Sequence, residues 1–429
     1  MSSPATLPAA LPGAGALRAR QAALAILQSA LARRGGLERA LSASDYLALS
    51  PQDRGFARAV VMTTLRRLGP IDRALDSKLK REPPAPARDL MRVGLAQAAW
   101  LDTPVFAAVD TAVSLAPKPL RPLVNAVLRG VLREGPIADE PEALAPAWLL
   151  ARWKAAYGEA EALAVAAQIA LEPATDLTLR DPGDHAMAVT LEAESLPGGS
   201  LRLSRRGDVA TWPGFEEGRW WVQDAAAAIP ARLLQINPGE AALDLCAAPG
   251  GKTLQMAAAG AAVTAVDQSA GRLRRVTAGL ARTGLAAETQ AVDAQTWNDT
   301  RRFDAVLLDA PCSATGTFRR HPDVLWNARP GDIAALTGIQ AGLLAAAARR
   351  VNGGGRMVYS VCSLEPEEGE AQVRGFLAAN SDFVLDPIAA GEGGSPAASL
   401  AAEGWLRILP QHAPGGLDGF FIARLRRAA

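Results

Sequence analysis

Two cysteines in the second half of the chain have the setting of nucleophiles. Cys312 stands in the segment DAPCSATG, directly after a predicted strand, and Cys362 ends another predicted strand in YSVCS. A thiolate can add to C6 of a cytosine ring and make C5 nucleophilic enough to take a methyl group from a sulfonium. An ordinary thiol has a pKa of about 8.5, so such a site must lower the pKa of its nucleophile.

The same reaction needs a second group after the methyl transfer. The C5 proton must leave and the thiol must be expelled, which requires a base. The second cysteine or an ordered water can serve, and residue types alone do not rank Cys312 and Cys362. Asp309, at the end of the strand before Cys312, is a further catalytic candidate because it can hydrogen-bond the cytosine edge. A free cysteine is more often a small buried hydrophobe, which is how we interpret the Cys246 thiol.

A glycine-containing loop occupies residues 244–253, with the sequence DLCAAPGGKT, between a predicted strand and a predicted helix. Adjacent glycines let a backbone approach a ligand closely, and a helix N-terminus favours anions. A phosphate-binding P-loop would need a glycine at the position of Cys246, and the strand ends in the acidic Asp244. A nucleoside triphosphatase is therefore disfavoured.

Acidic residues stand at the ends of four successive predicted strands. They are Asp244, Asp267, Asp293 and Asp309. In doubly wound sheets, an acid at the end of the second strand accepts hydrogen bonds from ribose hydroxyls. One such residue is more often a helix cap, but four in register indicate a ligand crevice. The nucleoside sulfonium S-adenosylmethionine fits this pattern, and we expect no metal.

A basic segment follows Cys312. Arg319 and Arg320 are adjacent, and His321 and Trp326 come shortly after them. Adjacent arginines bind phosphates and a tryptophan can stack on a base, so we expect these four residues to contact RNA. A solvated basic loop is the alternative interpretation.

The elements that must position these residues follow two patterns. From about Leu17 to Arg133, apolar residues recur at helical spacing, which predicts an all-α domain of six or seven helices. From residue 221, strand-length apolar runs alternate with helices, which predicts a parallel α/β sheet covered on both faces. We divide the chain into a disordered tail (1–15), a helical RNA-binding domain (16–135), a linker with a small α+β subdomain (136–220) and the α/β domain (221–429).

Charge is unevenly distributed along the chain. The formal net charge is +1, but residues 16–136 hold 19 Lys or Arg against 10 Asp or Glu. This basic segment favours a polyanion such as RNA as partner. Three cysteines in 429 residues cannot form a disulfide framework, which favours a reducing cytoplasm. Every apolar run of membrane-spanning length contains a charge or a proline, so we expect no membrane span.

Long segments of the chain resemble known families. DLCAAPGGKT, DAPCSATGTFRRHPDVLW and YSVCSLEPEEGE resemble the RNA (cytosine-5) methyltransferases, and GRWWVQDAAAAIPARLL is similar to the helix that leads into their catalytic domain. FAAVDTAVSLAPKPLRPLVNAVLRGVLRE resembles the helical domain of the transcription factor NusB. The pairing is similar to the bacterial RsmB (Sun/Fmu) type, which methylates one cytosine of 16S ribosomal RNA. The resemblance covers roughly residues 17–135 and 146–427.

The resemblance implies a Rossmann-like catalytic domain, S-adenosylmethionine as cofactor and 16S ribosomal RNA, free or in an assembly intermediate, as substrate. It implies that Cys362 is the nucleophile and that Cys312 assists product release. We expect a cytoplasmic monomer. The cofactor contacts that it implies are Asp244, Cys246, Ala247, Ala248, Pro249, Gly250, Gly251, Lys252, Asp267, Asp293 and Asp309.

Two other functions fit the same residues. One keeps the chemistry and changes the substrate to transfer RNA. The other is an RNA-binding or antitermination factor whose methyltransferase fold is inactive. The presence of Lys252, Cys312 and Cys362 argues against an inactive fold. The helical domain favours ribosomal over transfer RNA, but only by analogy.

Overall fold

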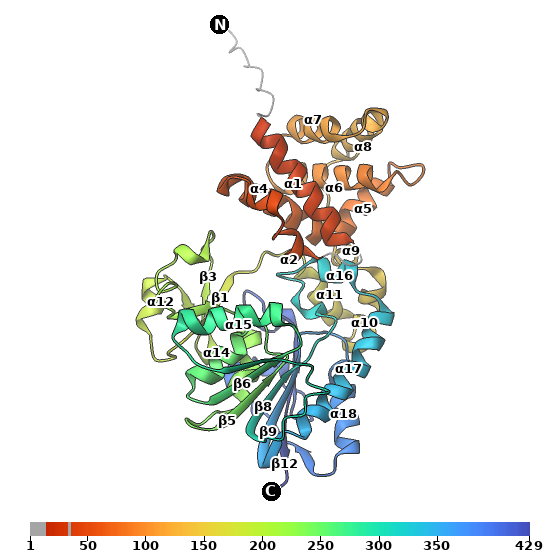
Figure 1. Ribbon diagram of the computed structural model, residues 1–429. Coiled ribbons are helices and arrows are strands. Elements are labelled where there is room, and N and C mark those ends of the chain that lie inside the picture. Colours follow the sequence, from red (N-terminus) through yellow and green to blue (C-terminus); the bar gives the residue numbers. More distant parts are fainter. Residues whose placement is uncertain (1–13, 33–35) are drawn as a thin grey trace. The chain divides into compact units, whose positions relative to one another are not determined.

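The computed structural model describes residues 14–32 and 36–429 and divides them into two units (Figure 1). The first unit runs to Leu171 and also contains His321–Asn327, and the second holds Glu172–Arg320 and Ala328–Ala429. Most of the predicted tail, residues 1–13, lies outside the described residues. Its last two residues, Ala14 and Gly15, already belong to the first helix.

The first unit is helical in its described part, as the spacing of apolar residues predicts. Ser50 caps α4 by accepting a hydrogen bond from the Asp53 backbone N–H, and Pro51 takes the first helical position, where a missing N–H costs nothing. Leu27 and Leu65 are fully buried in the core. The helices are α1 (Ala14–Leu31), α2 (Leu37–Ala40), α3 (Ser44–Leu47), α4 (Pro51–Arg66), α5 (Leu68–Asp76), α6 (Ala85–Trp100), α7 (Val105–Leu115), η1 (Lys118–Leu120), α8 (Arg121–Leu132), α9 (Pro141–Leu144), α10 (Ala147–Tyr157), α11 (Glu159–Ala167) and α16 (Asp323–Asn327).

The short helix α16 comes from far along the chain and packs within this first unit. The Trp326 indole Nε1 donates to the Leu65 carbonyl at 3.0 Å, and the indole packs against the core cluster of α1 and α4. Asp323 Oδ2 accepts a hydrogen bond from the Leu37 backbone N–H at 3.0 Å. These bonds join residues more than 250 positions apart, so sequence periodicity carries no signal for them.

The second unit contains a small antiparallel sheet with the strand order β2-β3-β1-β4. Leu177 and Trp220 lie in its apolar core. The elements are β1 (Thr175–Leu179), α12 (Ala186–Thr190), β2 (Glu194–Ser195), η2 (Pro197–Gly199), β3 (Ser200–Leu203), η3 (Val209–Thr211) and β4 (Trp220–Val222).

A second, eight-stranded sheet in this unit has the order β10-β12-β9-β8-β5-β6-β7, with β11 paired to β12. The strands are β5 (Ala241–Leu245), β6 (Ala262–Asp267), β7 (Glu288–Ala291), β8 (Phe303–Asp309), β9 (Val351–Val361), β10 (Phe383–Leu385), β11 (Leu406–Ile408) and β12 (Phe420–Arg427). The strands β5 to β9 pair in parallel, whereas β12 runs antiparallel to β9, β10 and β11. β11 and β12 therefore form an antiparallel pair beside the parallel strands.

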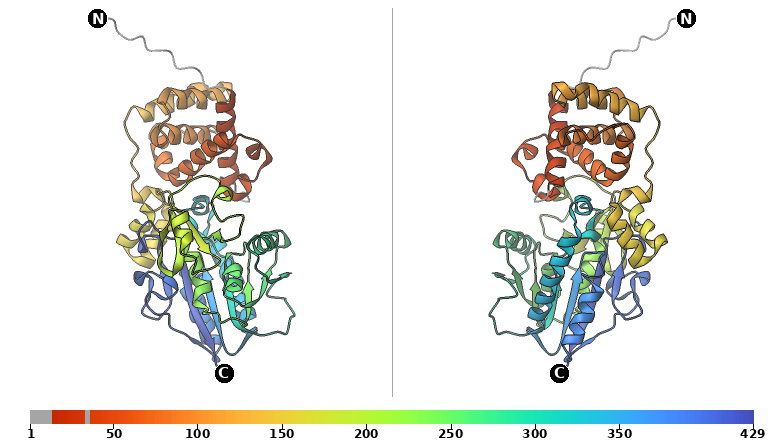
Figure 2. Two further views of the ribbon diagram at one scale, coloured as in Figure 1. Left: turned by 90° about the vertical axis from the view of Figure 1, so that its left-hand side faces the viewer. Right: turned by 90° about the vertical axis from the view of Figure 1, so that its right-hand side faces the viewer.

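Helices cover both faces of this sheet (Figure 2). Alternate strand residues face opposite layers: Leu243 packs in one apolar cluster with α17 and α18, and Ala242 packs in the other with α13 and α14. Within the described residues, α17 is the one helix long and apolar enough to cross a membrane, and its buried residues pack on β8 and β9. The helices are α13 (Ala225–Leu233), α14 (Gly251–Ala258), α15 (Ala270–Thr283), η4 (Thr315–Thr317), α17 (Pro330–Ala348), α18 (Glu370–Ala379), η5 (Glu392–Gly394), η6 (Ala397–Ser399) and η7 (Pro410–His412).

Candidate active site

The glycine-containing loop joins the end of β5 to the start of α14. Cys246 and Gly250 both adopt left-handed backbone conformations, with φ of 62° and 113°. A Cβ atom on Gly250 would lie 3.1 Å from the Val276 Cα atom, so a larger residue would push against α15. Burial, followed by the charges of nearby aspartates, raises the pKa of Cys246 to about 12. Its thiol is therefore unreactive, and only its backbone can serve a ligand.

Asp244 is the most deeply buried acid of this edge. Thr253 Oγ1 donates to Asp244 Oδ2 at 2.6 Å, while Oδ1 is buried and has no hydrogen-bond partner in the part of the chain that the structure describes. Burial raises the pKa of Asp244 to about 7, although the bond from Thr253 opposes this shift. An unsatisfied buried oxygen is costly unless a ligand donates to it.

Asp267 and Asp293 follow the next two strands, as the sequence predicts. Asp267 is buried and accepts hydrogen bonds from the backbone N–H groups of Ala248 and Ser269, at 3.2 and 2.9 Å. Asp293 is exposed, and its Oδ1 accepts from the Gln295 N–H at 2.9 Å. Asp267 therefore ties the glycine-containing loop to the end of β6, whereas Asp293 stabilises a surface turn.

Asp309, the fourth strand-end acid, forms an ion pair with the loop lysine. Lys252 Nζ lies 2.7 Å from Asp309 Oδ2, and Ser360 Oγ donates to Asp309 Oδ1 at 2.7 Å. Burial lowers the pKa of Lys252, but Asp309, followed by Cys362 and Asp244, outweighs burial and raises the pKa above its usual value. The Lys252 side chain is therefore a charged ammonium group, held by Asp309 beside the Cys362 thiol.

The structure brings the two cysteines into direct contact. Cys312 Sγ and Cys362 Sγ are 3.5 Å apart, although 50 positions separate them in the chain. The backbone N–H of Gly316 donates to the Cys362 carbonyl at 3.0 Å, which joins the two loops. The hydrogen bond with Cys362, followed by burial, raises the pKa of Cys312 well above its usual value. The pair can hold one negative charge between two sulfur atoms.

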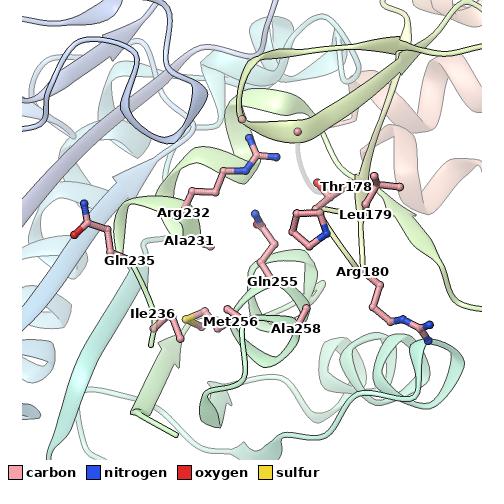
Figure 3. A pocket seen from close by; sticks show the side chains of 14 residues that line it. Thr178, Leu179, Arg180, Ala231, Arg232, Gln235, Ile236, Gln255, Met256 and Ala258 are labelled. Carbon is pink, nitrogen blue, oxygen red and sulfur yellow. The ribbon is translucent and has the colours of Figure 1, made fainter. Parts of the chain in front are cut away.

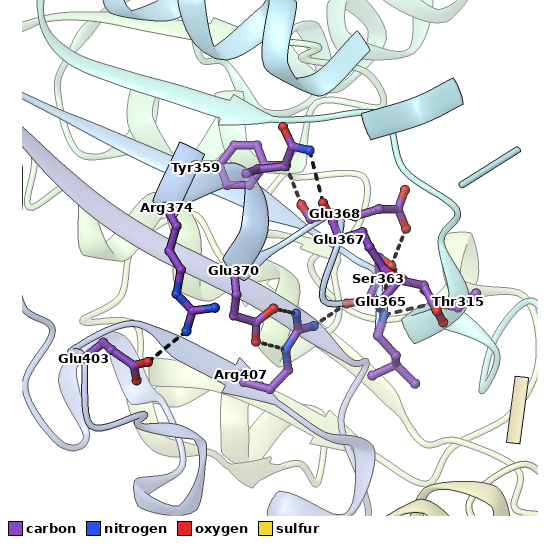
Figure 4. A network of polar contacts seen from close by, with 12 residues as sticks. Thr315, Tyr359, Ser363, Glu365, Glu367, Glu368, Glu370, Arg374, Glu403 and Arg407 are labelled. Atoms are coloured by element: carbon purple, nitrogen blue, oxygen red, sulfur yellow. Dashed lines mark hydrogen bonds and ion pairs between the residues drawn. The ribbon is translucent and has the colours of Figure 1, made fainter. Parts of the chain in front are cut away.

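A buried glutamate that the sequence patterns do not single out, Glu368, belongs to the polar network drawn in Figure 4. Glu368 is fully buried and accepts hydrogen bonds from the Ser313 backbone N–H at 2.9 Å and from Ser363 Oγ at 2.5 Å. Ser313 follows Cys312, and Ser363 follows Cys362. The acidic run EPEEGE after Cys362 was the available signal, because such a run beside a predicted pocket is not an ordinary solvated surface.

The basic segment after Cys312 is engaged by the protein itself. Arg319 is buried and donates from Nη2 to the Gly415 carbonyl at 2.5 Å. Arg320 forms an ion pair with Asp418, whose pKa burial raises to about 7. His321 is exposed, and Trp326 belongs to the first unit. In this structure the two arginines hold the loop to the segment before β12 instead of presenting their charges to phosphates.

A cavity of about 320 Å³ lies elsewhere in the second unit, between β1, α13 and α14 (Figure 3). Thr178, Arg232 and Gln255 line it, and none of the residues that the sequence predicts for the site does. Burial lowers the pKa of Arg232 to about 10. The residues that the sequence predicts for the site therefore do not lie around this cavity.

Asp244 gives the protein a testable dependence on pH. Its pKa is raised on folding to about 7, so its contribution to stability is complete below the unfolded pKa and is lost as the pH rises through 7. We expect Asp244→Asn to have a higher free energy of unfolding than the wild type at pH 8, by up to about 4 kcal/mol, and to lose most of this advantage at pH 5. Urea unfolding at both pH values measures this. An equal difference at both would contradict titration of this carboxyl group.

Two family comparisons match separate regions of the chain. Residues 231–426 match the family described as 16S rRNA methyltransferase RsmB/F, and residues 17–133 match the NusB family. A ribosomal RNA small subunit methyltransferase B of Xanthomonas campestris is 35% identical, over 98% of this chain and 100% of that protein. The protein of the same name from Pseudomonas syringae is 37% identical, over 88% of this chain and 90% of its own length.

Solved structures share the fold. The crystal structure of PH0851 superposes with a TM-score of 0.78 at 25% identity, covering 98% of this chain and all of the other. NSun6 from Pyrococcus horikoshii, crystallised with SFG, has a TM-score of 0.57 at 20% identity and covers 66% of this chain and 98% of its own. Together with the strand order, these matches confirm the expected fold class.

Proposed function

The chain belongs to the RsmB/F family of 16S rRNA methyltransferases, and on that premise we propose that it methylates C5 of a cytosine in small-subunit ribosomal RNA. The methyl donor is S-adenosylmethionine, and Cys362 forms a transient bond to C6. The observation that carries this proposal is the pair of thiols, 3.5 Å apart, beside the ion pair of Lys252 and Asp309. The protein acts as a monomer in the cytoplasm, on free RNA or on an assembly intermediate.

The residues around the glycine-containing loop fit the cofactor. The unpartnered Asp244 Oδ1 calls for a donor, and the backbone of Cys246 to Lys252 lines the start of α14. We assign Asp267, at the end of the second strand, to the ribose hydroxyls and Asp293, after the third strand, to the adenine. When bound, S-adenosylmethionine supplies a methyl group on a positively charged sulfur, which the activated C5 takes up.

The charges around Cys362 favour its role as nucleophile. The Lys252 ammonium beside it stabilises the thiolate, which is the form that adds to C6. Asp309 is held by Lys252 and Ser360 and keeps part of its carboxylate exposed, so it can hydrogen-bond the cytosine edge. Electron density then moves from sulfur through C6 to C5.

Release of the product requires two bonds to break. A base removes the proton at C5, the C5–C6 double bond re-forms, and the C6–sulfur bond breaks with Cys362 leaving as a thiolate. Cys312 lies 3.5 Å from Cys362 and is the group we assign to this step. Once Cys362 is bonded to carbon, its negative charge no longer raises the pKa of Cys312, so Cys312 can lose its proton to solvent and its thiolate can then accept the C5 proton.

The identity of the product tests this proposal. Purified protein, labelled S-adenosylmethionine and unmodified small-subunit ribosomal RNA are incubated, and the RNA is digested to nucleosides and separately sequenced after bisulfite treatment. We expect 5-methylcytidine at one position. Transfer RNA is tested in parallel. If only transfer RNA were labelled, it would replace ribosomal RNA as the proposed substrate. If neither RNA were labelled, the result would favour an inactive RNA-binding factor.

The first unit has a row of arginines suited to phosphates. Arg121, Arg129 and Arg133 are exposed, and their spacing of eight and four residues places them on one side of α8 and its C-cap. These side chains donate to neutral oxygens, such as Asn125 Oδ1 for Arg129, and none has a carboxylate partner among the described residues. Arg73, another cation of this unit, is instead neutralised by Glu140. We call these three residues the α8 arginine row.

The α8 arginine row predicts a salt-dependent contribution to RNA binding. Replacing all three arginines by alanine removes up to three phosphate contacts, so the slope of log affinity against log salt should fall by about 2 to 3. Fluorescence anisotropy with a labelled ribosomal RNA fragment at several salt concentrations measures the slope. Arg73→Ala is the control, because it removes a cation that Glu140 already neutralises. An unchanged slope in the triple variant would remove this face from the RNA interface.

A further inference from the structure

Glu368 stands where the two cysteine loops meet, and its hydrogen bonds reach both. Oε1 accepts from the Ser313 N–H and from Gln340 Nε2 at 3.0 Å, and Oε2 accepts from the hydroxyl groups of Ser313 and Ser363. Gln340 also donates to the Pro311 carbonyl at 3.0 Å. The backbone on either side of Cys312 is therefore fixed by Glu368 and by its partner on α17.

The charged groups around the two thiols differ in sign. Lys252 is the cation beside Cys362, and it is held in place by Asp309. Glu368 is the acid whose charge acts on Cys312, and the Tyr359 hydroxyl, near the same thiol, donates to the Glu368 carbonyl at 2.6 Å. A positive charge near one sulfur and a negative charge near the other make the two thiols unequal.

We propose that Glu368 is a positioning residue that assigns the roles of the two cysteines, by fixing the Cys312 loop against the Cys362 loop and by placing a negative charge beside Cys312. Cys362, beside Lys252, is then the nucleophile. Cys312 stays a neutral thiol until Cys362 has bonded to carbon. This inference rests on the proposed function, and it supplies the ranking of the two cysteines that residue types alone leave open.

Alkylation of the free protein tests this assignment without RNA or cofactor. Iodoacetamide reacts with thiolates, so the initial rate at each cysteine, read from its own peptide by mass spectrometry, reports the thiolate fraction. In the wild type we expect Cys362 to react first near pH 7.5. In Glu368→Gln the rate at Cys312 should rise at least about threefold, because each pKa unit changes an alkylation rate roughly three- to fourfold.

Two controls separate charge from structure. Glu367→Gln makes the same change at the exposed neighbouring residue and should leave both rates unchanged. Glu368→Asp keeps the charge and should keep Cys312 slow. General opening of the site would accelerate Cys362 as well, so the ratio of the two rates in one sample is the decisive quantity.

A second variant offsets the negative charge of Glu368 without replacing Glu368 itself. Gln340→Lys places an ammonium group where the amide now meets Glu368 Oε1, and it should also accelerate Cys312 selectively. If Glu368→Gln and Gln340→Lys both fold and the ratio of the Cys312 rate to the Cys362 rate is unchanged, the proposal is overturned. Failure of both variants to fold would also overturn it, because Glu368 would then act in stability alone. The alkylation assay contains no RNA, so its result does not depend on methyl transfer. A failure of the proposed function would instead appear in the product assay, as absence of 5-methylcytidine.

Discussion

Cys362→Ala is expected to abolish both methyl transfer and covalent capture of RNA, whereas Cys312→Ala is expected to methylate and then stall on its product. Without the Cys362 thiol no bond to C6 can form, so C5 is not activated and label incorporation should fall to the level without protein. Without Cys312 the adduct forms but its release is slow. After incubation with RNA and labelled cofactor, a denaturing gel should show a protein–RNA species only for Cys312→Ala.

The two substitutions delete the same thiol at neighbouring sites, which makes each a control for the other. Loss of packing predicts similar outcomes for both, but the proposed roles predict opposite ones. Steps in series are not additive, so the double variant should behave as Cys362→Ala alone. A trapped complex with Cys362→Ala and none with Cys312→Ala would invert the assignment. No complex with either variant would leave the covalent step without support.

Lys252→Met is expected to impair folding stability and catalysis together. The ion pair of Lys252 with Asp309 is 2.7 Å long, and the lysine side chain is only 12% exposed. Removing one partner of such a pair leaves the other charge uncompensated, at a cost of about 3 kcal/mol. The thiolate of Cys362 also loses its neighbouring cation. Urea unfolding, together with the alkylation rate of Cys362, measures both effects.

A matched substitution on the surface of the first unit tests the specificity of this loss. Lys154 pairs with Glu159 at the same distance of 2.7 Å, but the Lys154 side chain is 34% exposed and that of Glu159 is 73% exposed. Surface ion pairs contribute little to stability, so Lys154→Met should match the wild type both in urea unfolding and in the alkylation rate of Cys362. If Lys252→Met were as stable as Lys154→Met, the buried pair would have no structural role. If the alkylation rate of Cys362 were then also unchanged, Lys252 would not activate it.

Features that depend on local order along the chain were predictable. The ends of parallel strands meet at one sheet edge, so apolar runs followed by Asp244, Asp267 and Asp309 located the candidate site. The same rule placed both cysteines at that edge. The spacing of apolar residues likewise predicted an all-α part and an α/β part. Burial of one face of a helix or strand imposes this spacing on the sequence.

Side-chain partners that lie far apart in the chain were not predictable. Nothing in the segment that contains Arg319 and Arg320 indicates that Gly415 and Asp418 accept their hydrogen bonds, about 100 positions away. Adjacent arginines have the same pattern whether they bind phosphates or a buried aspartate. Glu368 is similar, since its role depends on two loops that only the folded sheet brings together.

The packing of α16 within the first unit has a consequence for protein synthesis. The helices up to Leu171 leave the ribosome first, but His321 emerges 150 positions later. At about 5–20 residues per second, this interval lasts roughly 8–30 s. Until then the nascent helices lack the indole of Trp326, and the N–H of Leu37 lacks its carboxylate acceptor. Maturation of the N-terminal unit therefore awaits translation of the catalytic one.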